Sequence, residues 1–370
     1  MRMLKVWLHR FFHHNYELSY EAEANKPHDP ILKLVTQAGS NPVTATSQEK
    51  QFNGVHTTAA VFDGTDDQFS DYVDACFFNW IAGEQRAELQ QNRAFERQLI
   101  DYLDTLAASE LAGSNLIARV PSVMVQLLKR MHEENVSSSE LSRLIAKDVV
   151  IVAAILGEVN SSFYNYSEKI SDLSQAILLL GHNRLRMVLA KVSFTPVFNA
   201  QLSALSTITA SKIWEHSQKR ALTAYLLAKH QHIDPFMGFL AGLMQDVGLM
   251  VALRVFDRSN GATSLPTSTV FRETLKRKTI ILSTRIGYTW SLPEAVIKSI
   301  QGQSSEDTNL TKMPITKLLK RADLLSKICT LMTAGQLPVD VERIRAMLTD
   351  AEADCLFTLL EGNASIATIF

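Results

Sequence analysis

Apolar side chains recur at helical spacing along most of this chain. Between residues 69 and 81 the apolar positions alternate in steps of three and one, which places them on one face of a helix. Gly83 favours the end of that helix. Residues 84–111 repeat the pattern around Leu99, Leu103 and Leu106. We therefore expect a small helical N-terminal region over residues 67–112.

The rest of the chain reads as further helices with short joints. An apolar run over residues 176–180 stops at Gly181, a residue that commonly ends helices. Asp148 precedes another apolar stretch and is a good helix cap. The helices expected after Gly181 cover residues 182–199, 207–230, 235–255, 270–286, 293–300, 314–332 and 339–360. Only residues 55–62 suggest a strand, so the pattern predicts an all-α protein, a multi-helix bundle.

The first 66 residues differ from the rest. Residues 1–15 place Leu4, Trp7 and Phe11 on one helical face with basic residues elsewhere, which indicates an amphipathic helix. This helix can lie on a membrane surface, a peripheral contact through residues 1–14, or pack on protein; both interpretations stay open. Residues 16–66 are polar with repeated Pro and Gly, which is typical of a linker.

Composition narrows the class of protein. The formal net charge is −1, so there is no overall attraction to nucleic acid, and we expect no nucleic-acid partner. No uninterrupted apolar run reaches the length of a transmembrane helix. The three cysteines lie far apart without CxxC spacing, which fits a reducing cytoplasmic location.

Five short motifs at the joints together resemble the HDOD domain, a bacterial all-helical relative of the HD phosphohydrolases. They are Asn160-Ser161-Ser162, Ala176-Ile177 with Leu180-Gly181, Trp214-Glu215-His216-Ser217, Ala241-Gly242-Leu243 before Gln245-Asp246, and Trp290-Ser291-Leu292-Pro293. The resemblance covers about residues 115–330 and implies an HD-like bundle, with C-terminal helices over residues 331–370 packing on it. It also implies a signalling or regulatory module.

By the same resemblance, six positions correspond to the metal ligands of a catalytic HD site. They are His216, Gln245, Asp246, Ser283, Gln303 and Asp323. A catalytic site of this class needs several imidazoles and carboxylates around one or two metal ions, which activate water. Only His216, Asp246 and Asp323 keep such groups here.

The replaced positions argue against a metal. Gln and Ser offer neutral oxygens, which do not replace imidazole for zinc, iron or manganese. In addition, no histidine follows His232 in the sequence. One imidazole and two carboxylates can at most hold Mg²⁺ or Mn²⁺ weakly. We therefore expect a degenerate HD motif with no catalytic residue, no bound metal and no cofactor.

Structural roles explain the retained residues equally well. Asp246 can bond to backbone N–H groups near Val247 and Gly248 at a helix end. His216 can be a buried histidine bonded to Asp246. Asp323 can pair with Lys320 or Arg321 on a solvated helix face, or it can belong to the vestigial cluster.

A second group of polar residues follows Gly181. Arg184, Arg186 and Lys191 form a small basic patch, which can contact a phosphate or an acidic partner. A solvated helix face is the alternative interpretation.

Three functions are compatible with the sequence. The sequence keeps the motifs of the family but lacks several of its metal ligands, which favours a non-catalytic signalling protein that acts through protein partners. A metal-dependent phosphohydrolase with an unusual site is the first alternative. The second is a sensor whose emptied pocket binds a nucleotide, for example a cyclic dinucleotide, without hydrolysing it.

Overall fold

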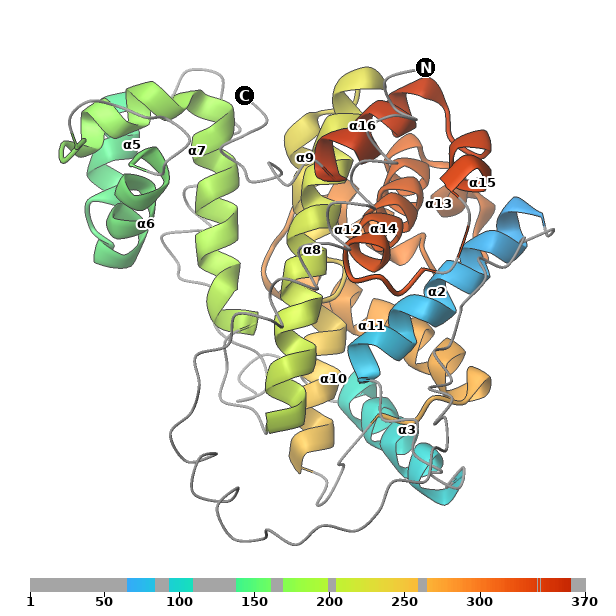
Figure 1. Ribbon diagram of the computed structural model, residues 1–370. Helices are drawn as coiled ribbons and strands as arrows, with labels where there is room; N and C mark the ends of the chain where they lie inside the picture. Colours follow the sequence, from blue (N-terminus) through green and yellow to red (C-terminus); the bar gives the residue numbers. More distant parts are fainter. Residues whose placement is uncertain are drawn as a thin grey trace, which may run out of the picture. The chain divides into compact units, whose positions relative to one another are not determined.

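The computed structural model describes residues 65–83, 93–108, 138–160, 169–198, 204–258, 265–337, 339 and 341–360. Within these ranges every regular element is a helix, which confirms the all-α prediction (Figure 1). The amphipathic segment 1–15, nearly all of the linker 16–66 and the strand suggested at 55–62 lie outside the described residues.

The chain divides into two compact units. One unit comprises Met1–Val61 and Pro338–Ala346, and its described helix is α15 (Val341–Ala346). The other comprises Phe62–Leu337 and Met347–Phe370 and holds the remaining helices. These are α2 (Asp66–Ala82), α3 (Arg93–Ala108), α5 (Ser138–Ile145), α6 (Val149–Val159), α7 (Leu173–Phe198), α8 (Ala204–His230), α9 (Pro235–Met244), α10 (Val247–Arg258), α11 (Thr269–Thr289), α12 (Glu294–Gln301), α13 (Thr308–Lys312), α14 (Pro314–Thr333) and α16 (Asp350–Leu360).

The N-terminal helix α2 ends at Gly83, as its sequence predicts. Thr65 caps it through a reciprocal pair of bonds with Gln68, and Gly83 follows it with a φ of 88°. Its apolar face is buried against α14 and α8. At its end, the carbonyl oxygens of Trp80 and Ile81 accept hydrogen bonds from Lys212 and Thr209 of α8. Helix α2 is therefore held on the bundle by apolar and polar contacts.

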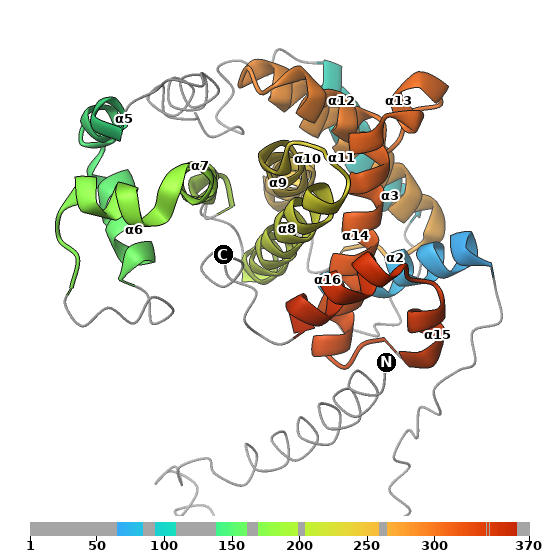
Figure 2. The ribbon, with the colours of Figure 1, turned by 90° about the horizontal axis from the view of Figure 1, so that it is seen from above.

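The centre of the bundle is α8, which packs against both α9 and α14 (Figure 2). The approach of α9 to α8 is close because Gly242 has no side chain. A Cβ atom at Gly242 would lie 2.7 Å from the Cα atom of Ala221, well inside van der Waals contact. This contact brings the end of α9 beside the middle of α8.

The single helix expected over residues 235–255 is instead two helices. Helix α9 ends at Met244 and α10 begins at Val247, so Gln245 and Asp246 form the joint. Ser283 of α11 stabilises this joint, because its hydroxyl donates to the carbonyl oxygen of Gln245 at 2.6 Å and accepts from the amide of Gly248 at 2.8 Å. The joint is short, because the amide of Gln245 still donates to the carbonyl oxygen of Ala241 and the carbonyl oxygen of Asp246 accepts from the amide of Met250.

Helices α9 and α10 together form the one described segment with the length and hydropathy of a membrane span, Pro235–Asp257. Its most apolar window is 89% buried inside the protein. Burial of this kind is what the core helix of a bundle requires.

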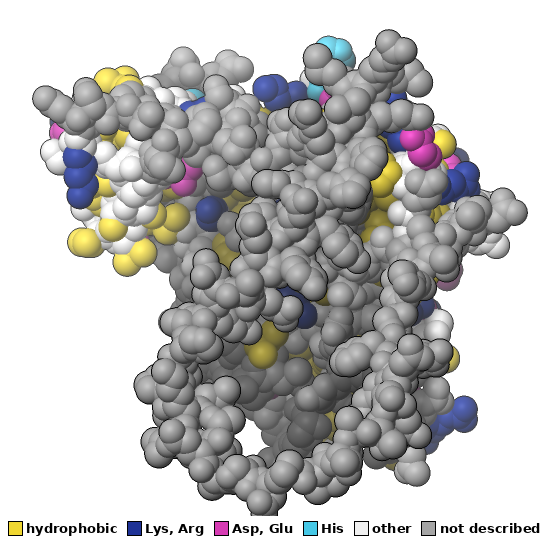
Figure 3. All heavy atoms as spheres, in the orientation of Figure 1, with side chains coloured by type: hydrophobic (Ala, Val, Ile, Leu, Met, Phe, Trp, Pro, Cys, Tyr) yellow, Lys and Arg dark blue, Asp and Glu magenta, His cyan; other side chains and the backbone are white. Residues whose placement is uncertain are grey.

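Helices α5, α6 and α7 pack together. Asp148 caps α6 as predicted, accepting from the amides of Val150 and Ile151. Gly181 interrupts α7 with a φ of 69° where the sequence predicts a helix end. Val149 and Val150, in the first turn of α6, are 80% and 68% exposed, and hydrophobic side chains gather on the surface over α5 and α6 (Figure 3).

The helix expected over residues 339–360 is also divided in two. Helix α15 ends at Ala346 and α16 begins at Asp350. Helix α16 packs against α8 and α14.

Candidate functional site

His216 and Arg220 lie one turn apart on α8, so their side chains leave the helix on the same face. Both are fully buried, with exposed fractions of 0% and 1%. The face that they share is directed at the joint between α9 and α10 on one side and at α14 on the other. Those two elements carry Asp246 and Asp323.

The guanidinium of Arg220 lies between the two carboxylates. Its Nη1 atom is 2.8 Å from Oδ1 of Asp323, and its Nη2 atom is 2.8 Å from Oδ2 of Asp246. The Nε atom donates to the carbonyl oxygen of Gly242 at 2.9 Å. Nη1 also lies 3.2 Å from Nε2 of His216. Arg220 thus contacts all three residues that keep a metal-binding group.

A second cation lies on the other side of Asp323. The Nζ atom of Lys327 is 2.5 Å from Oδ2 of Asp323 and 2.7 Å from Oδ1 of Asp74, a residue of α2. Asp74 also pairs with Lys276 of α11 at 2.5 Å. We call these six residues the charge cluster: Asp74, Arg220, Asp246, Lys276, Asp323 and Lys327. Three carboxylates balance three cations in it, so the bundle holds these charges without net excess.

The charges of Asp323 and Lys327 are fixed near neutral pH. Burial alone would raise the pKa of Asp323, but Lys327, the hydrogen bond from His216 and Arg220 together hold that pKa well below its usual range. Burial alone would lower the pKa of Lys327. The charges and hydrogen bonds of Asp323 and Asp74 outweigh burial and raise that pKa above its usual range. Asp323 is therefore ionised and Lys327 protonated.

Burial shifts the pKa of His216 in the direction that favours its uncharged form. Its complete burial lowers its pKa, and the nearby Arg220 lowers it further, although Asp323 and Asp246 act in the other direction. Its ring packs against Phe77 of α2, with the ring centroids 4.3 Å apart. His216 is accordingly a neutral imidazole in a closed environment.

These contacts correct three structural roles expected from the sequence. The Nε2 atom of His216 lies 3.4 Å from Oδ1 of Asp323 and 3.2 Å from Nη1 of Arg220, so Asp246 is not its bonding partner. Asp246 binds Arg220 and accepts from Ser217, while the amide of Gly248 is satisfied by Ser283. Asp323 is only 13% exposed and faces Arg220 and Lys327, so the solvated pairing with Lys320 or Arg321 is wrong.

Arg321 points elsewhere on α14. It forms a two-point ion pair with Glu352 of α16. The side chains at positions 321 and 323 leave α14 in different directions, as residues two apart on a helix do.

Two of the six predicted positions bond to backbone groups instead of to the charge cluster. Ser283 stabilises the joint between α9 and α10, as described above. Gln303 donates through Nε2 to the carbonyl oxygens of Ser299 and Thr316, which ties the end of α12 to the start of α14. Both side chains therefore hold elements of the bundle in place.

Gln245 lies beside the cluster. It is 9% exposed, and its Oε1 atom is buried without a hydrogen-bond partner among the described residues. Gln245 and Asp246 both line a cavity that α2, α10 and α11 enclose. A buried acceptor without a donor is costly, so this position calls for an explanation.

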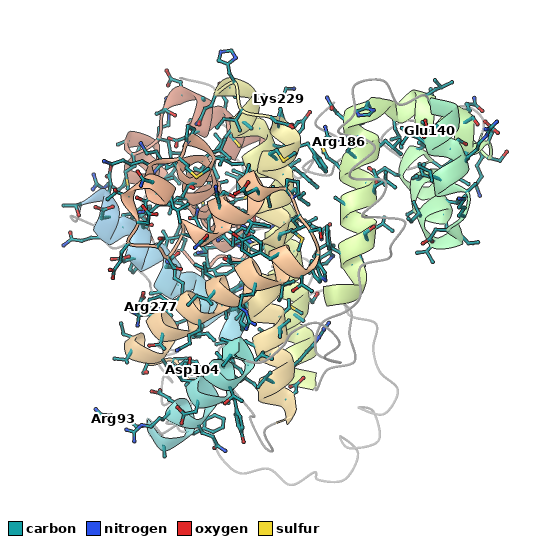
Figure 4. All side chains as sticks on the ribbon, turned by 180° about the vertical axis from the view of Figure 1, so that it is seen from behind. Arg93, Asp104, Glu140, Arg186, Lys229 and Arg277 are labelled. Carbon is teal, nitrogen blue, oxygen red and sulfur yellow. The ribbon has the colours of Figure 1, made fainter. Side chains whose placement is uncertain are left out.

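The basic residues after Gly181 are less exposed than a solvated face requires. Arg184 and Arg186 are each 7% exposed, and Lys191 is half-buried. The guanidinium of Arg186 lies 3.9 Å from the ring centroid of Phe236, on the side of α7 beside α9 (Figure 4). The solvated-face interpretation is therefore wrong for the two arginines, whose stems pack inside the bundle.

Sequence reasoning did not place Arg220, Lys327, Asp74 or Lys276 at this site. For two of them a signal was present, because Arg220 follows His216 by four residues and Lys327 follows Asp323 by four. A cation one helical turn after a ligand position shares its face and can reach it. Asp74 carries no such signal, because it comes from a helix far away in the sequence.

Comparisons with known proteins place this bundle among related sequences and structures. The HDOD domain family matches residues 117–305. An uncharacterized protein from Treponema pallidum (strain Nichols) is 21% identical over 208 residues, which cover 53% of this chain and 39% of that protein. This chain thus aligns with less than half of the length of that relative.

Two solved structures resemble the fold. An HDOD domain protein with unknown function from Geobacter sulfurreducens has a TM-score of 0.49 and 17% identity, over 71% of this chain and 97% of that one. A protein from Shewanella amazonensis SB2B, whose name suggests a metal-dependent phosphohydrolase, has a TM-score of 0.45 and 14% identity, over 74% and 99%.

Proposed function

The chain belongs to the HDOD domain family, and from this premise we propose that it is a non-catalytic signalling or regulatory protein that acts through protein partners. The observation that carries the proposal is the position of Arg220. Its guanidinium contacts His216, Asp246 and Asp323 at once. In this proposal a side chain of the protein takes the place of the metal ion of a catalytic HD site, and the HD motif is degenerate.

The residues present do not fit a divalent ion. One oxygen of each carboxylate and the Nε2 atom of His216 are already directed at Arg220. Two unit charges 4 Å apart repel by about 4 kcal/mol at an effective dielectric constant of about 20, and a divalent ion doubles that repulsion. The other expected ligand positions hold Gln245, Ser283 and Gln303, whose neutral oxygens bind such ions weakly. This donor set supports the non-catalytic function over the metal-dependent phosphohydrolase.

Exposed apolar side chains support the part of the proposal that concerns protein partners. Val149 and Val150 are adjacent and largely exposed in the first turn of α6, and Leu178 of α7 is 70% exposed. Apolar side chains left in water are one property of protein contact surfaces. A cytoplasmic location and a peripheral membrane contact through residues 1–14 belong to the same proposal, and those residues lie outside the described part of the chain.

Elemental analysis and activity assays on the full-length protein test the proposal. The purified protein should contain well below one divalent metal ion per chain, and it should hydrolyse no phosphoester when Mn²⁺, Fe²⁺ or Mg²⁺ is added. Gln245→His should not restore metal binding while Arg220 is present. The proposal fails if the protein binds stoichiometric metal and has a phosphoesterase activity that Asp246→Ala abolishes.

A further inference from the structure

Helix α6 is apolar on all its sides, although one side of it is open to water. Of its 11 residues, Glu158 alone is charged. Ile151, Ile155 and Val159 are buried, and α6 packs against α7. The side of α6 opposite these three residues is exposed. A helix without a polar side is typical of a position that is covered all round, so the exposed side indicates a contact surface for another protein.

The exposed side of α6 has large side chains at one end and a recess at the other. We call it the α6 face, and it consists of Val149, Val150, Ala153 and Gly157. Val149 and Val150, in the first turn, are 80% and 68% exposed. Ala153 and Gly157 are exposed further along the helix, and a Cβ atom at Gly157 would have nothing within 4 Å. Val149, Ala153 and Gly157 are four residues apart, so they follow one line along the helix.

The shape of the α6 face is complementary to itself under a two-fold rotation. Val149 and Gly157 lie four residues on either side of Ala153. When two antiparallel copies of α6 meet at Ala153, Val149 of each copy lies opposite the recess at Gly157 of the other. The small side chain of Ala153 lets the two helices approach closely at the axis. A two-fold interface uses the same patch on both copies, and this face meets that condition.

The charges at the two ends of α6 are complementary in the same arrangement. Lys147 is exposed just before the helix and Glu158 is half-buried in its last turn, and neither has an ion-pair partner. Within one chain they are too far apart to pair, because 11 residues of helix span about 16 Å. In the antiparallel arrangement each Lys147 lies beside Glu158 of the other copy. Asp148 does not compete, since its carboxylate caps α6. The charges therefore favour a second copy of this chain as the occupant.

We propose that the α6 face is a self-association surface, on which a second copy of this chain docks with its own α6 antiparallel. The inference rests on the proposed function and deepens it, because it names one protein partner. A contact along a single helix of about 16 Å buries less than the roughly 1,200 Å² of standard interfaces. The dimer is therefore weak and reversible, with an expected dissociation constant of about 10–100 µM.

Sedimentation equilibrium of the full-length protein tests the surface. Between about 1 and 200 µM, the average mass should rise from that of one chain toward that of two. Val149→Glu should raise the dissociation constant at least about tenfold, because the dimer would bury an unpaired carboxylate. The same change suits the first turn of a helix, so the monomer should fold normally.

Val270→Glu is the matched control. Val270 is 77% exposed in the first turn of α11, and it does not belong to the α6 face. This variant introduces the same charge in the same kind of position, and it should leave the dissociation constant within about twofold of the wild type. Circular dichroism checks that both variants keep their helices.

Charge reversal tests the antiparallel direction. Lys147→Glu and Glu158→Lys should each raise the dissociation constant by about fivefold, because every dimer then holds two like-charge pairs. An equimolar mixture of the two single variants should associate about as tightly as the wild type, since opposite charges meet again at both ends. Because the mixture contains the same two proteins, its recovery separates a lost contact from a folding defect.

A protein that stays monomeric over this concentration range would overturn the inference, even if a different protein bound at the α6 face. A dimer that Val149→Glu leaves unchanged, or that Val270→Glu weakens equally, would overturn it too. So would a mixture of the charge variants that associates no more tightly than either variant alone. None of these measurements involves metal content or hydrolysis, so failure of this inference is distinguishable from failure of the proposed function.

Discussion

Arg321 of α14 and Glu352 of α16 form a two-point ion pair, with Nε 2.6 Å from Oε1 and Nη2 3.0 Å from Oε2. Glu352 also accepts from the amide and hydroxyl of Thr349 at the start of α16. The pair fixes the C-terminal helix to the helix that carries Asp323. Parallel contacts of this kind are stronger than single ion pairs because both oxygens are engaged.

We expect Glu352→Gln to lower the free energy of unfolding by about 1–3 kcal/mol, since it removes a charge-assisted pair at a mostly buried position. Chemical denaturation at neutral pH measures this. Asp354→Asn, a neutralisation at an exposed position of the same helix, is the control and should change stability by less than about 0.5 kcal/mol. Equal effects of the two variants would contradict the role of the pair.

The stabilisation that Glu352 contributes should depend on pH. Burial would raise the pKa of Glu352, but the hydrogen bond and charge of Arg321 and the bonds from Thr349 lower it overall. A carboxyl group with a lowered folded-state pKa stabilises fully above its unfolded pKa, and this contribution is lost as the pH falls through the folded value. The stability difference between wild type and Glu352→Gln should therefore shrink as the pH falls below about 4.3, the ordinary pKa of Glu.

Arg220→Met should be among the most destabilising substitutions in the bundle. It leaves Asp246 and Asp323 partly buried without their shared cation, and breaking a buried ion pair from one side costs about 3–5 kcal/mol. Lys219→Met is the matched control, because Lys219 pairs with the exposed Glu215 on the same helix. That change should cost less than about 1 kcal/mol. Thermal unfolding of both variants gives the comparison, and similar melting temperatures would refute it.

His216 should make stability rise with pH in the acidic range. Because its folded-state pKa is lowered by burial, the unfolded chain binds a proton that the folded chain does not. The contribution is complete above the unfolded pKa of about 6.5 and is lost as the pH falls below it toward the folded value. Between these limits, the free energy of unfolding should rise more steeply with pH for the wild type than for His216→Gln. Denaturation curves measured at several pH values give this comparison. Nitrogen NMR should show a neutral ring, and a protonated ring at neutral pH would contradict this prediction.

Gly248→Ala should disrupt the joint between α9 and α10. A Cβ atom there would lie 2.0 Å from the carbonyl oxygen of Thr279 and 2.7 Å from the amide nitrogen of Ser283. Both are backbone atoms, so the helices must separate, at a cost of about 1–3 kcal/mol or more. Gly157→Ala, in the interior of α6 with nothing within 4 Å, should instead stabilise by up to about 1 kcal/mol. Denaturant midpoints that move in the same direction for both variants would contradict the argument.

The helices and their family were predictable from the sequence because they depend on local signals. Asp148 and Gly83 lie at helix ends as predicted, and Gly181 interrupts α7 at the position where the sequence predicts an end. Two expectations conflicted at Asp246, a helix end there and one helix over residues 235–255, and the structure has the helix end, which Ser283 of α11 stabilises.

The candidate site was predictable only in part for the same physical reason. Helical spacing places Arg220 near His216 and Lys327 near Asp323, so these cations follow from position alone once the face is known. The partners of Asp246 and the contribution of Asp74 depend on which helices meet. That information belongs to tertiary packing, which no window of sequence contains.

The position of α2 has a consequence for how this protein is produced and dissected. The family match begins at residue 117, yet Asp74 neutralises Lys327 and Lys276, and Phe77 covers His216. A fragment cut at the edge of the match would remove Asp74 from Lys276, leave Lys327 with Asp323 alone, and expose an apolar surface to water. The smallest piece that folds like the whole should begin before Asp66, so a truncation series should lose solubility and cooperative unfolding once α2 is removed.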